Sequence, residues 1–322
     1  MSRPFVRLPP GLGSGFSVAA ARGAGVSERR LRGGDLESPF WGVRCAPFVP
    51  PSQNGLVDVD ALELRHRMDA YAQRMPEHRF FWGLAALVAW RGILPVPAPL
   101  LAVGVLAPDR APRAAGVEGR RFAPHLVTVR EHGGLRVTSP ASTWMTLAPV
   151  LPHRDLVAVG SLLVTPPRGA GGAVVGPPLC TVSNLRSAID AGPRPGIRAA
   201  RRAVALVRVG ARSRPEVHLW LALTEAGLPG LPEAQFDAPI RDATGALIGY
   251  GDLAFPEFRT YIEYQGDYHR LSRDAWARDI TKRQRAREAG WHEIEIVRRE
   301  LYPDPAPAVA RTARALRDRG WR

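Results

Sequence analysis

The first region of the chain, residues 1–50, alternates short apolar runs with glycines and arginines. Its pattern predicts a helix, a tight turn, a second helix that begins after Ser27, and a short strand, over the letters FSVAAARGAGVSERRLRGGDLESPFWGVRCAP. This order is typical of a helix-turn-helix with a wing, and also of a generic helical hairpin whose arginines face water. In the first interpretation Arg29 and Arg30, on the second helix, contact DNA.

The second region, residues 51–165, predicts a mixed α+β scaffold. An amphipathic helix is expected over VDVDALELRHRMDAYAQRM, before the longest apolar tract of the chain, residues 80–108. Arg91 and several prolines interrupt this tract, and a membrane-spanning helix needs about 20 uninterrupted apolar residues. A buried helix followed by a buried strand is therefore favoured. Alternating strands around the turn HGG and two further helices complete the region.

The sequence of the remaining chain predicts a linker followed by a domain of helices and strands. Residues 166–211 predict a Pro/Gly-rich linker followed by a basic helical segment. Residues 212–322 predict the order α-β-β-β-α-β-α, in which Ser213 caps the first helix and Glu216 stands three residues later. The fourth strand is expected over WHEIEIVRREL. The expected fold class is α/β, or α+β for the chain as a whole.

Two acids and an amide stand close together in the predicted hairpin of this last region. Asp252 lies on one strand, and Glu263 and Gln265 lie on the next, where alternation places both on one face. A turn over residues 256–259 would bring Asp252 beside Glu263. Two such carboxylates repel unless a proton or cation lies between them, and Mg²⁺ (or Mn²⁺) takes ligands of this kind. The alternative is a hairpin with polar residues on its solvated face.

The same region resembles a known family of nucleases. The element order, Asp252, the run EYQG at residues 263–266, the pair His269-Arg270 and the pair Gly290-Trp291 resemble the very-short-patch-repair-like endonuclease domains of the PD-(D/E)xK superfamily, over about residues 212–300. The resemblance implies a restriction-endonuclease-like α-β-β-β-α-β fold.

Site roles also follow from this resemblance. Asp252 and Glu263 would be metal ligands, Glu216 would match the helix glutamate of the family, and Gln265 would occupy the position of a lysine or, in close relatives, an aspartate. His269 would contact the scissile phosphate or transfer a proton, or be a structural histidine. Lys282, on the following helix, is a candidate for the missing positive charge, the alternative being a solvated lysine.

The first two regions are similar to the antitoxin-like, winged-helix parts that often precede such domains. The runs GVSERRLR, GVEGRR and VTSPASTWMTLA carry this likeness. Where those relatives tend to have an arginine and an aspartate, this chain has Ser142 and Thr146. No role tied to those two positions is carried over.

The charge balance adds a candidate partner. Lysine and arginine number 44 against 30 acids, for a formal net charge of +14, and Lys282 is the only lysine. Such a charge fits a polyanion, most simply DNA, and it also follows from GC-rich codon usage. The basic helix after the hairpin is either a solvated face offset by acids or a phosphate-binding surface. Its candidate contacts are Arg278, Lys282, Arg283 and Arg285.

These observations predict a cytoplasmic DNA-acting protein with no membrane partner. Cys45 and Cys180 fit two reduced cysteines of a cytosolic protein, and the first residues show no signal peptide. The function expected from the resemblance is Mg²⁺-dependent endonuclease activity on DNA. A second copy of the chain, in a homodimer, is a candidate partner. The alternative is a non-catalytic DNA-binding regulator, or an antitoxin-like protein, whose nuclease fold has decayed.

Overall fold

The computed structural model describes residues 7–51, 58–169, 172–266 and 273–322, with only the backbone given for 273–278. These residues form two compact units. The first comprises the chain up to Pro149 together with residues 187–197, and the second comprises residues 150–186 and 198–322. The predicted connection over 166–211 is thus shared between the two units, and residues 150–165 belong with the C-terminal one.

The first unit begins with short elements held by serine caps. They are η1 (Pro10–Leu12), β1 (Gly15–Ser17), α1 (Val18–Gly23), α2 (Glu28–Leu31) and β2 (Val43–Cys45). Ser17 and Ser27 cap the two helices by accepting hydrogen bonds from backbone N–H groups three residues ahead. The predicted helix, turn, helix and strand are confirmed. Each helix is short, α2 having only four residues, and β1 pairs antiparallel with β2.

The rest of the first unit is a five-stranded sheet with packed helices. Its elements are α3 (Val59–Ala72), β3 (Arg79–Phe81), α4 (Gly83–Arg91), β4 (Leu101–Leu106), β5 (Val117–Phe122), η2 (Pro124–Leu126), β6 (Val129–His132), β7 (Leu135–Thr138) and α5 (Pro140–Leu147). The sheet has the order β5-β4-β3-β7-β6. The apolar tract forms buried α4 and then buried β4, as expected. In the described part of the chain, no helix has the length and apolarity to cross a membrane.

Ser142 and Thr146 are buried structural residues of α5. The hydroxyl of Ser142 accepts a hydrogen bond from the backbone N–H of Thr128 at 2.9 Å. The hydroxyl of Thr146 donates to the carbonyl of Thr143 at 2.7 Å. Both side chains therefore satisfy their polar groups inside the first unit.

The second unit joins a set of helices to a four-stranded sheet. Its elements are α6 (His153–Val164), most of α7 (Val182–Asp190) and α8 (Ile197–Leu206), α9 (Arg214–Glu225), β8 (Gln235–Arg241), β9 (Leu247–Phe255), η3 (Pro256–Phe258), β10 (Thr260–Gln265), α10 (Arg273–Glu288), β11 (His292–Val297), α11 (Arg298–Leu301) and α12 (Ala306–Asp318). The predicted order α-β-β-β-α-β-α is confirmed by these elements.

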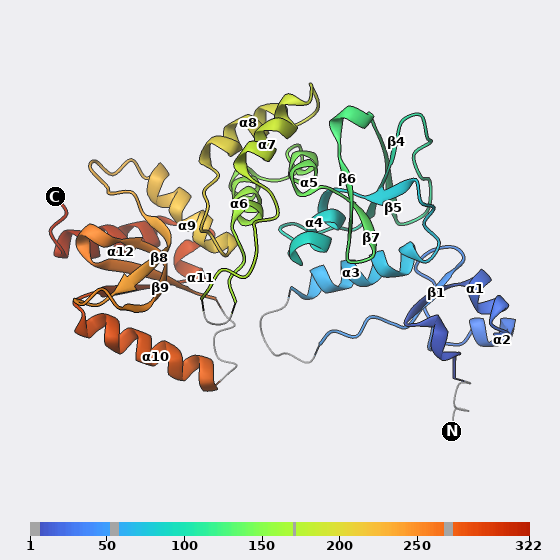
Figure 1. Cartoon of the computed structure of the whole chain (residues 1–322), viewed down its shortest axis with the longest axis horizontal. Helices are drawn as coiled ribbons and strands as arrows, with labels where there is room; N and C mark the ends of the chain where they lie inside the picture. The colour runs from blue at the N-terminus through green and yellow to red at the C-terminus, as the bar shows by residue number, and fades with distance from the viewer. Residues whose placement is uncertain (1–6, 52–57, 170–171, 267–272) are drawn as a thin grey trace. The chain divides into compact units, whose positions relative to one another are not determined.

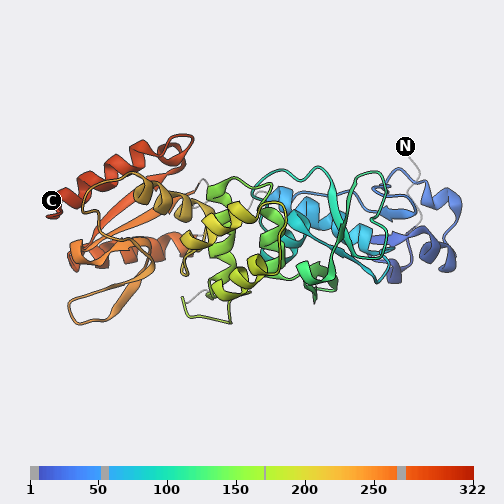
Figure 2. The same cartoon turned by 90° about the horizontal axis from the view of Figure 1, so that it is seen from above.

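The sheet of the second unit has the order β11-β10-β9-β8 and lies between helices. β8, β9 and β10 form antiparallel pairs, whereas β10 and β11 are parallel and are joined by the crossover that contains α10. Figure 1 shows α10 on one side of the strands and α12 on the other, and Figure 2 shows the same order from a perpendicular direction. The sheet is thus covered on both faces, which makes its polar side chains partly buried.

One predicted element differs from the observed one. The strand expected over residues 291–301 ends at Val297, and residues 298–301 form the single turn of α11. The carboxylate of Glu300 accepts a hydrogen bond from the backbone N–H of Val297 at 3.0 Å and pairs with Arg311 at 2.9 Å. This cap turns the chain out of the sheet, so the strand prediction for residues 298–301 is wrong.

Candidate active site

The hairpin of β9 and β10 brings Asp252 and Glu263 together. The two strands pair antiparallel as far as Ile262 opposite Leu253, and one further step sets Glu263 opposite Asp252. At this point the carboxylate of Asp252 replaces the backbone ladder, since its Oδ2 accepts a hydrogen bond from the backbone N–H of Tyr264 at 2.8 Å. Asp252 is therefore held in one orientation at the place where the strands part.

A third carboxyl group comes from the first turn of α9. Ser213 caps this helix as predicted, and Glu216 is buried, with 4% of its surface exposed. Its Oε2 accepts a hydrogen bond from the backbone N–H of Arg212 at 2.8 Å. Burial raises the pKa of Glu216 to about 7, and the nearby charge of Glu263 adds to the rise. Glu216 is thus both part of the helix cap and part of the acidic cluster.

The three carboxyl groups are electrostatically coupled. Burial, as the larger cause, raises the pKa of both Asp252 and Glu263. The charge of Glu216 raises the pKa of Asp252 further, and the charge of Asp252 does the same for Glu263. The ammonium of Lys282 opposes both shifts. Such a cluster favours binding of protons or of a cation, because water screens the repulsion between buried carboxylates only weakly.

Lys282 reaches the cluster from α10. Its Nζ lies 2.5 Å from Oε1 of Glu263 and 5.4 Å from the ring centroid of Tyr261. The aliphatic part of its side chain lies over Gly249 on β9, where an added Cβ would stand 3.1 Å from the lysine Cδ. Of the two alternatives from the sequence, the structure favours the one in which this lysine joins the acids, since its side chain is only 18% exposed.

Gln265 and His269 differ in what can be said of them. Gln265 is the last residue of β10, two positions after Glu263, and stands opposite Val297 in the parallel pair with β11. The alternation of strand side chains puts its amide on the face of Glu263. His269 lies outside the described residues, so its role stays a prediction.

Three further residues belong to this site without any sequence motif. Gly249 and Tyr261 contact Lys282, as described above. Asp237 on β8 raises the pKa of Asp252, and its own Oδ2 is held by Arg168 at 2.7 Å and Arg212 at 2.6 Å. No spacing rule connects Asp237 to these arginines, which lie 69 and 25 positions away.

The basic residues of α10 differ in their exposure and in their ion pairs, and therefore in how readily they could contact a phosphate. Arg283 faces β11, with its Nε 3.1 Å from Glu293 and a second nitrogen 3.8 Å from Glu295. Arg285 is exposed. For Arg278 the structure gives the backbone alone. A phosphate contact stays a prediction for each, with Arg285 the best exposed of those described.

The two arginines predicted to contact DNA in the first unit also differ. Arg29 is exposed. Arg30 forms a bidentate ion pair with Asp35, with nitrogen–oxygen distances of 2.9 and 2.7 Å, and its side chain is 10% exposed. Arg30 therefore stabilises the turn after α2, and a DNA contact stays a prediction that its geometry does not favour.

The donor set of the cluster fits a hard divalent cation. Among the described residues, no group of three or more His, Cys, Asp or Glu side chains is arranged to hold a metal ion. Mg²⁺, however, is usually held by one or two carboxylates together with water and substrate phosphates, not by a complete protein cage. Asp252 and Glu263 are two oxygen donors of this kind, and their mutual repulsion would be relieved by such a cation.

Comparison with known proteins gives relatives but no activity. No family model matches the chain, and no solved structure matches it. Two uncharacterized proteins of Mycobacterium tuberculosis, from strains CDC 1551 / Oshkosh and ATCC 25618 / H37Rv, are each 31% identical to it over 138 residues. The match covers 42% of this chain and 49% of each relative. The chain thus spans about half the length of the curated relatives it matches.

Proposed function

We propose that the second unit is a metal-dependent DNA endonuclease of the PD-(D/E)xK type, in which the lysine is supplied from a helix. The observation that carries this proposal is the meeting of Asp252 and Glu263 where β9 and β10 part, with the ammonium of Lys282 on Glu263. Two acids at one point can hold a divalent cation for phosphodiester hydrolysis, and a lysine beside them can stabilise negative charge on the phosphate. The element order of the unit and the net charge of the whole chain, +14, support the same proposal.

Asp252 and Glu263 would hold Mg²⁺ or Mn²⁺. When bound, the ion would lower the pKa of a water and offset charge on the phosphate. The hydrogen bond from Tyr264 fixes the direction of the Asp252 carboxylate, so this ligand does not need to be ordered when DNA arrives. In the reaction, a water oxygen forms a bond to phosphorus, the bond from phosphorus to one sugar oxygen breaks, and that oxygen gains a proton.

Lys282 and Gln265 would act on the water and the phosphate. The ammonium of Lys282 can turn from Glu263 toward a phosphate oxygen and stabilise its negative charge in the transition state. The amide oxygen of Gln265 can accept a hydrogen bond from the attacking water and orient it. Gln265 cannot supply the positive charge that a lysine would, which gives Lys282 its importance here.

The test is cleavage of supercoiled plasmid by the purified full chain in Mg²⁺, in Mn²⁺ and in chelator. Asp252→Asn and Glu263→Gln should abolish metal-dependent nicking and leave DNA affinity nearly unchanged. Glu257→Gln is the matched control, because Glu257 is an exposed carboxylate in the turn of the same hairpin. Nicking that survives in both site variants would show that the activity, if any, lies elsewhere.

A second candidate is a DNA-binding regulator with a decayed nuclease fold. The observation that favours it is Gln265 in place of a charged residue. A regulator should bind DNA equally well with or without chelator, and its melting temperature should not rise with Mg²⁺. A rise that is lost in Asp252→Asn would instead support the nuclease.

A further inference from the structure

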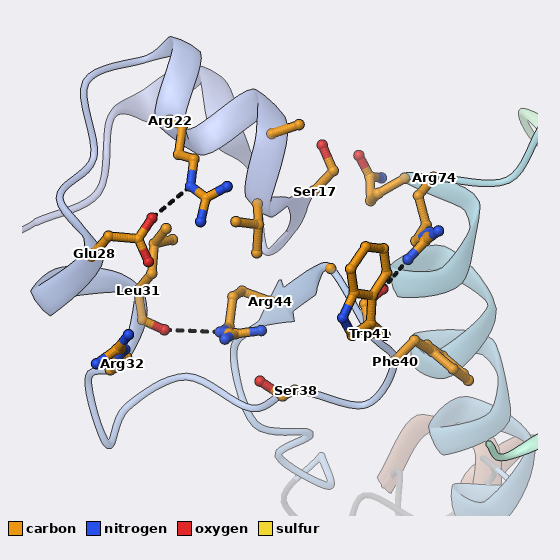
Figure 3. Close-up of a pocket in the computed structure, with 14 residues that line it drawn as sticks. Ser17, Arg22, Glu28, Leu31, Arg32, Ser38, Phe40, Trp41, Arg44 and Arg74 are labelled. Atoms are coloured by element: carbon orange, nitrogen blue, oxygen red, sulfur yellow. Dashed lines mark hydrogen bonds and ion pairs between the residues drawn. The ribbon is translucent and has the colours of Figure 1, made fainter. Parts of the chain in front are cut away.

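The first unit contains a positively charged pocket that the proposed nuclease site does not use. Its volume is about 760 Å³, within the range of about 300–1,000 Å³ typical of ligand sites. α1, α2, the segment before β2, and the end of α3 form its walls (Figure 3). The charged residues that line it are one acid, Glu28, and four arginines: Arg22, Arg32, Arg44 and Arg74.

The arginines of the pocket are held in different ways. Arg44 is fixed by hydrogen bonds from its Nε to the carbonyl of Leu31 at 2.8 Å and from Nη1 to that of Val43 at 2.9 Å. These bonds use two of the five N–H donors of a guanidinium group. Arg22 pairs with Glu28 at 2.5 Å, whereas Arg32 is exposed. One acid therefore neutralises only part of the charge, and the pocket suits an anion.

The aromatic part of the pocket is Trp41, which is 86% exposed. An indole ring this exposed offers a large flat apolar face on which another flat group can stack. Arg74 donates a hydrogen bond to the carbonyl of Trp41, and its guanidinium carbon lies 4.8 Å from the centroid of the indole ring. Figure 3 shows Arg74 beside the ring, with Arg44 on the other side of the ring in this view. The ring is thus oriented from one side and leaves surface for a second flat group.

We propose that this pocket binds an unpaired nucleotide of single-stranded DNA, with its base stacked on Trp41 and its phosphates on the arginines. Aromatic rings between positive side chains are the usual binding surface for single strands, because every base offers a flat face. Bases in a duplex are already stacked and do not present this face. The one-turn length of α2 also favours this mode over insertion of a recognition helix into a major groove.

The proposal is independent of cleavage and is tested by binding in chelator. The full chain is titrated onto three fluorescent probes of equal length: oligothymidine, an abasic oligonucleotide with the same phosphates, and a blunt duplex. Oligothymidine should bind about tenfold more tightly than the abasic probe, since stacking of one base has an effect of this size. Trp41→Ala should remove this preference and Trp41→Phe should keep most of it. The melting temperature should not change, because the side chain is exposed.

The charge of the pocket is tested through salt. Arg32→Gln should reduce the slope of log K against log salt by about 0.7 for oligothymidine, the value for one phosphate contact on a single strand. Arg110→Gln, a matched change at an exposed arginine of the same unit, should leave the slope as it is. A preference for oligothymidine that persists in Trp41→Ala would overturn the proposal. So would displacement of oligothymidine by oligoglutamate at equal charge, which would indicate an acidic protein partner.

Discussion

The ammonium nitrogen of Lys282 lies 2.5 Å from Oε1 of Glu263, although the two residues are 19 positions apart and belong to a helix and a strand. The proposed nuclease site would call for a charged residue two positions after Glu263, where this chain has Gln265. In that proposal the single lysine of the chain would supply from α10 the charge that β10 lacks. This arrangement makes the lysine, and the residues that orient it, the most informative positions to change.

Replacing Lys282 should separate its charge from its packing. Lys282→Met keeps much of the aliphatic chain but removes the ammonium, and the rate of plasmid nicking should fall about a hundredfold, the usual effect of losing one group that stabilises transition-state charge. Lys282→Arg should recover part of that loss because the positive charge returns in a different shape. Arg287→Met, at an exposed cation of the same helix, serves as the control. Full activity in Lys282→Met would show that the lysine only neutralises the charge of Glu263 and takes no part in cleavage.

Gly249 should matter because of the lysine that lies over it. A Cβ at this position would meet three side-chain carbons of Lys282 at 3.1 to 3.3 Å. Gly249→Val fits the strand conformation, so the melting temperature should change little, but the ammonium should move away from Glu263. Nicking should slow about tenfold. In the double variant, Gly249→Val should slow nicking hardly at all beyond the effect of Lys282→Met, because the two residues act through one contact.

Glu216 should make the protein less stable as pH rises. Its pKa is about 7 in the folded protein against an ordinary value of 4.5. The folded state therefore holds the proton more tightly, and stability is lost between these two pH values as the pH increases. The loss is on the order of 3 kcal/mol at most. Glu216→Gln keeps an oxygen for the backbone N–H of Arg212 and should flatten this part of the pH dependence.

The measurement is denaturant unfolding from about pH 5 to about pH 8, below the pKa of lysine and arginine, and histidine titration is shared by the wild-type protein and the variant. The difference between wild-type protein and Glu216→Gln should grow in favour of the variant as the pH rises. A parallel course for the two proteins would show that the carboxyl group of Glu216 stays ionised after folding.

Local chemistry allowed much of the second unit to be predicted. The serine cap with its glutamate, and the strand that carries Glu263 and Gln265, depend on residues close in sequence, and both elements are present as expected. The contact of Lys282 with Glu263 depends on how α10 packs, so the sequence alone does not decide between a lysine of the site and a solvated lysine. The sequence does not predict the helical turn at residues 298–301. Its cap comes from the side chain of Glu300, and the residues around Glu300 alternate as in a strand. The arginine pocket around Trp41 needs four separate elements, and no local pattern indicates it.

Buried and exposed ion pairs join α6 to α9, and they should contribute differently to stability. Asp155 is buried and accepts from Arg214 at 2.5 and 3.0 Å, with His218 at 3.3 Å, whereas Arg154 and Glu225 pair at 2.8 Å with more than 40% of each side chain exposed. Burial by itself would raise the pKa of Asp155, but the hydrogen bonds from His218 and Arg214 outweigh it and lower the pKa.

Asp155→Ala should therefore cost about 3 kcal/mol of unfolding free energy, because it breaks the partly buried ion pair between Asp155 and Arg214. Arg154→Ala should cost less than about 1 kcal/mol, since water and salt already screen its pair. Denaturant unfolding of both variants tests this directly. Because α9 also carries Glu216, Asp155→Ala should lower nicking activity at temperatures where the wild-type protein is still fully folded. Equal costs for the two changes would mean that the buried network does not hold α9 in place.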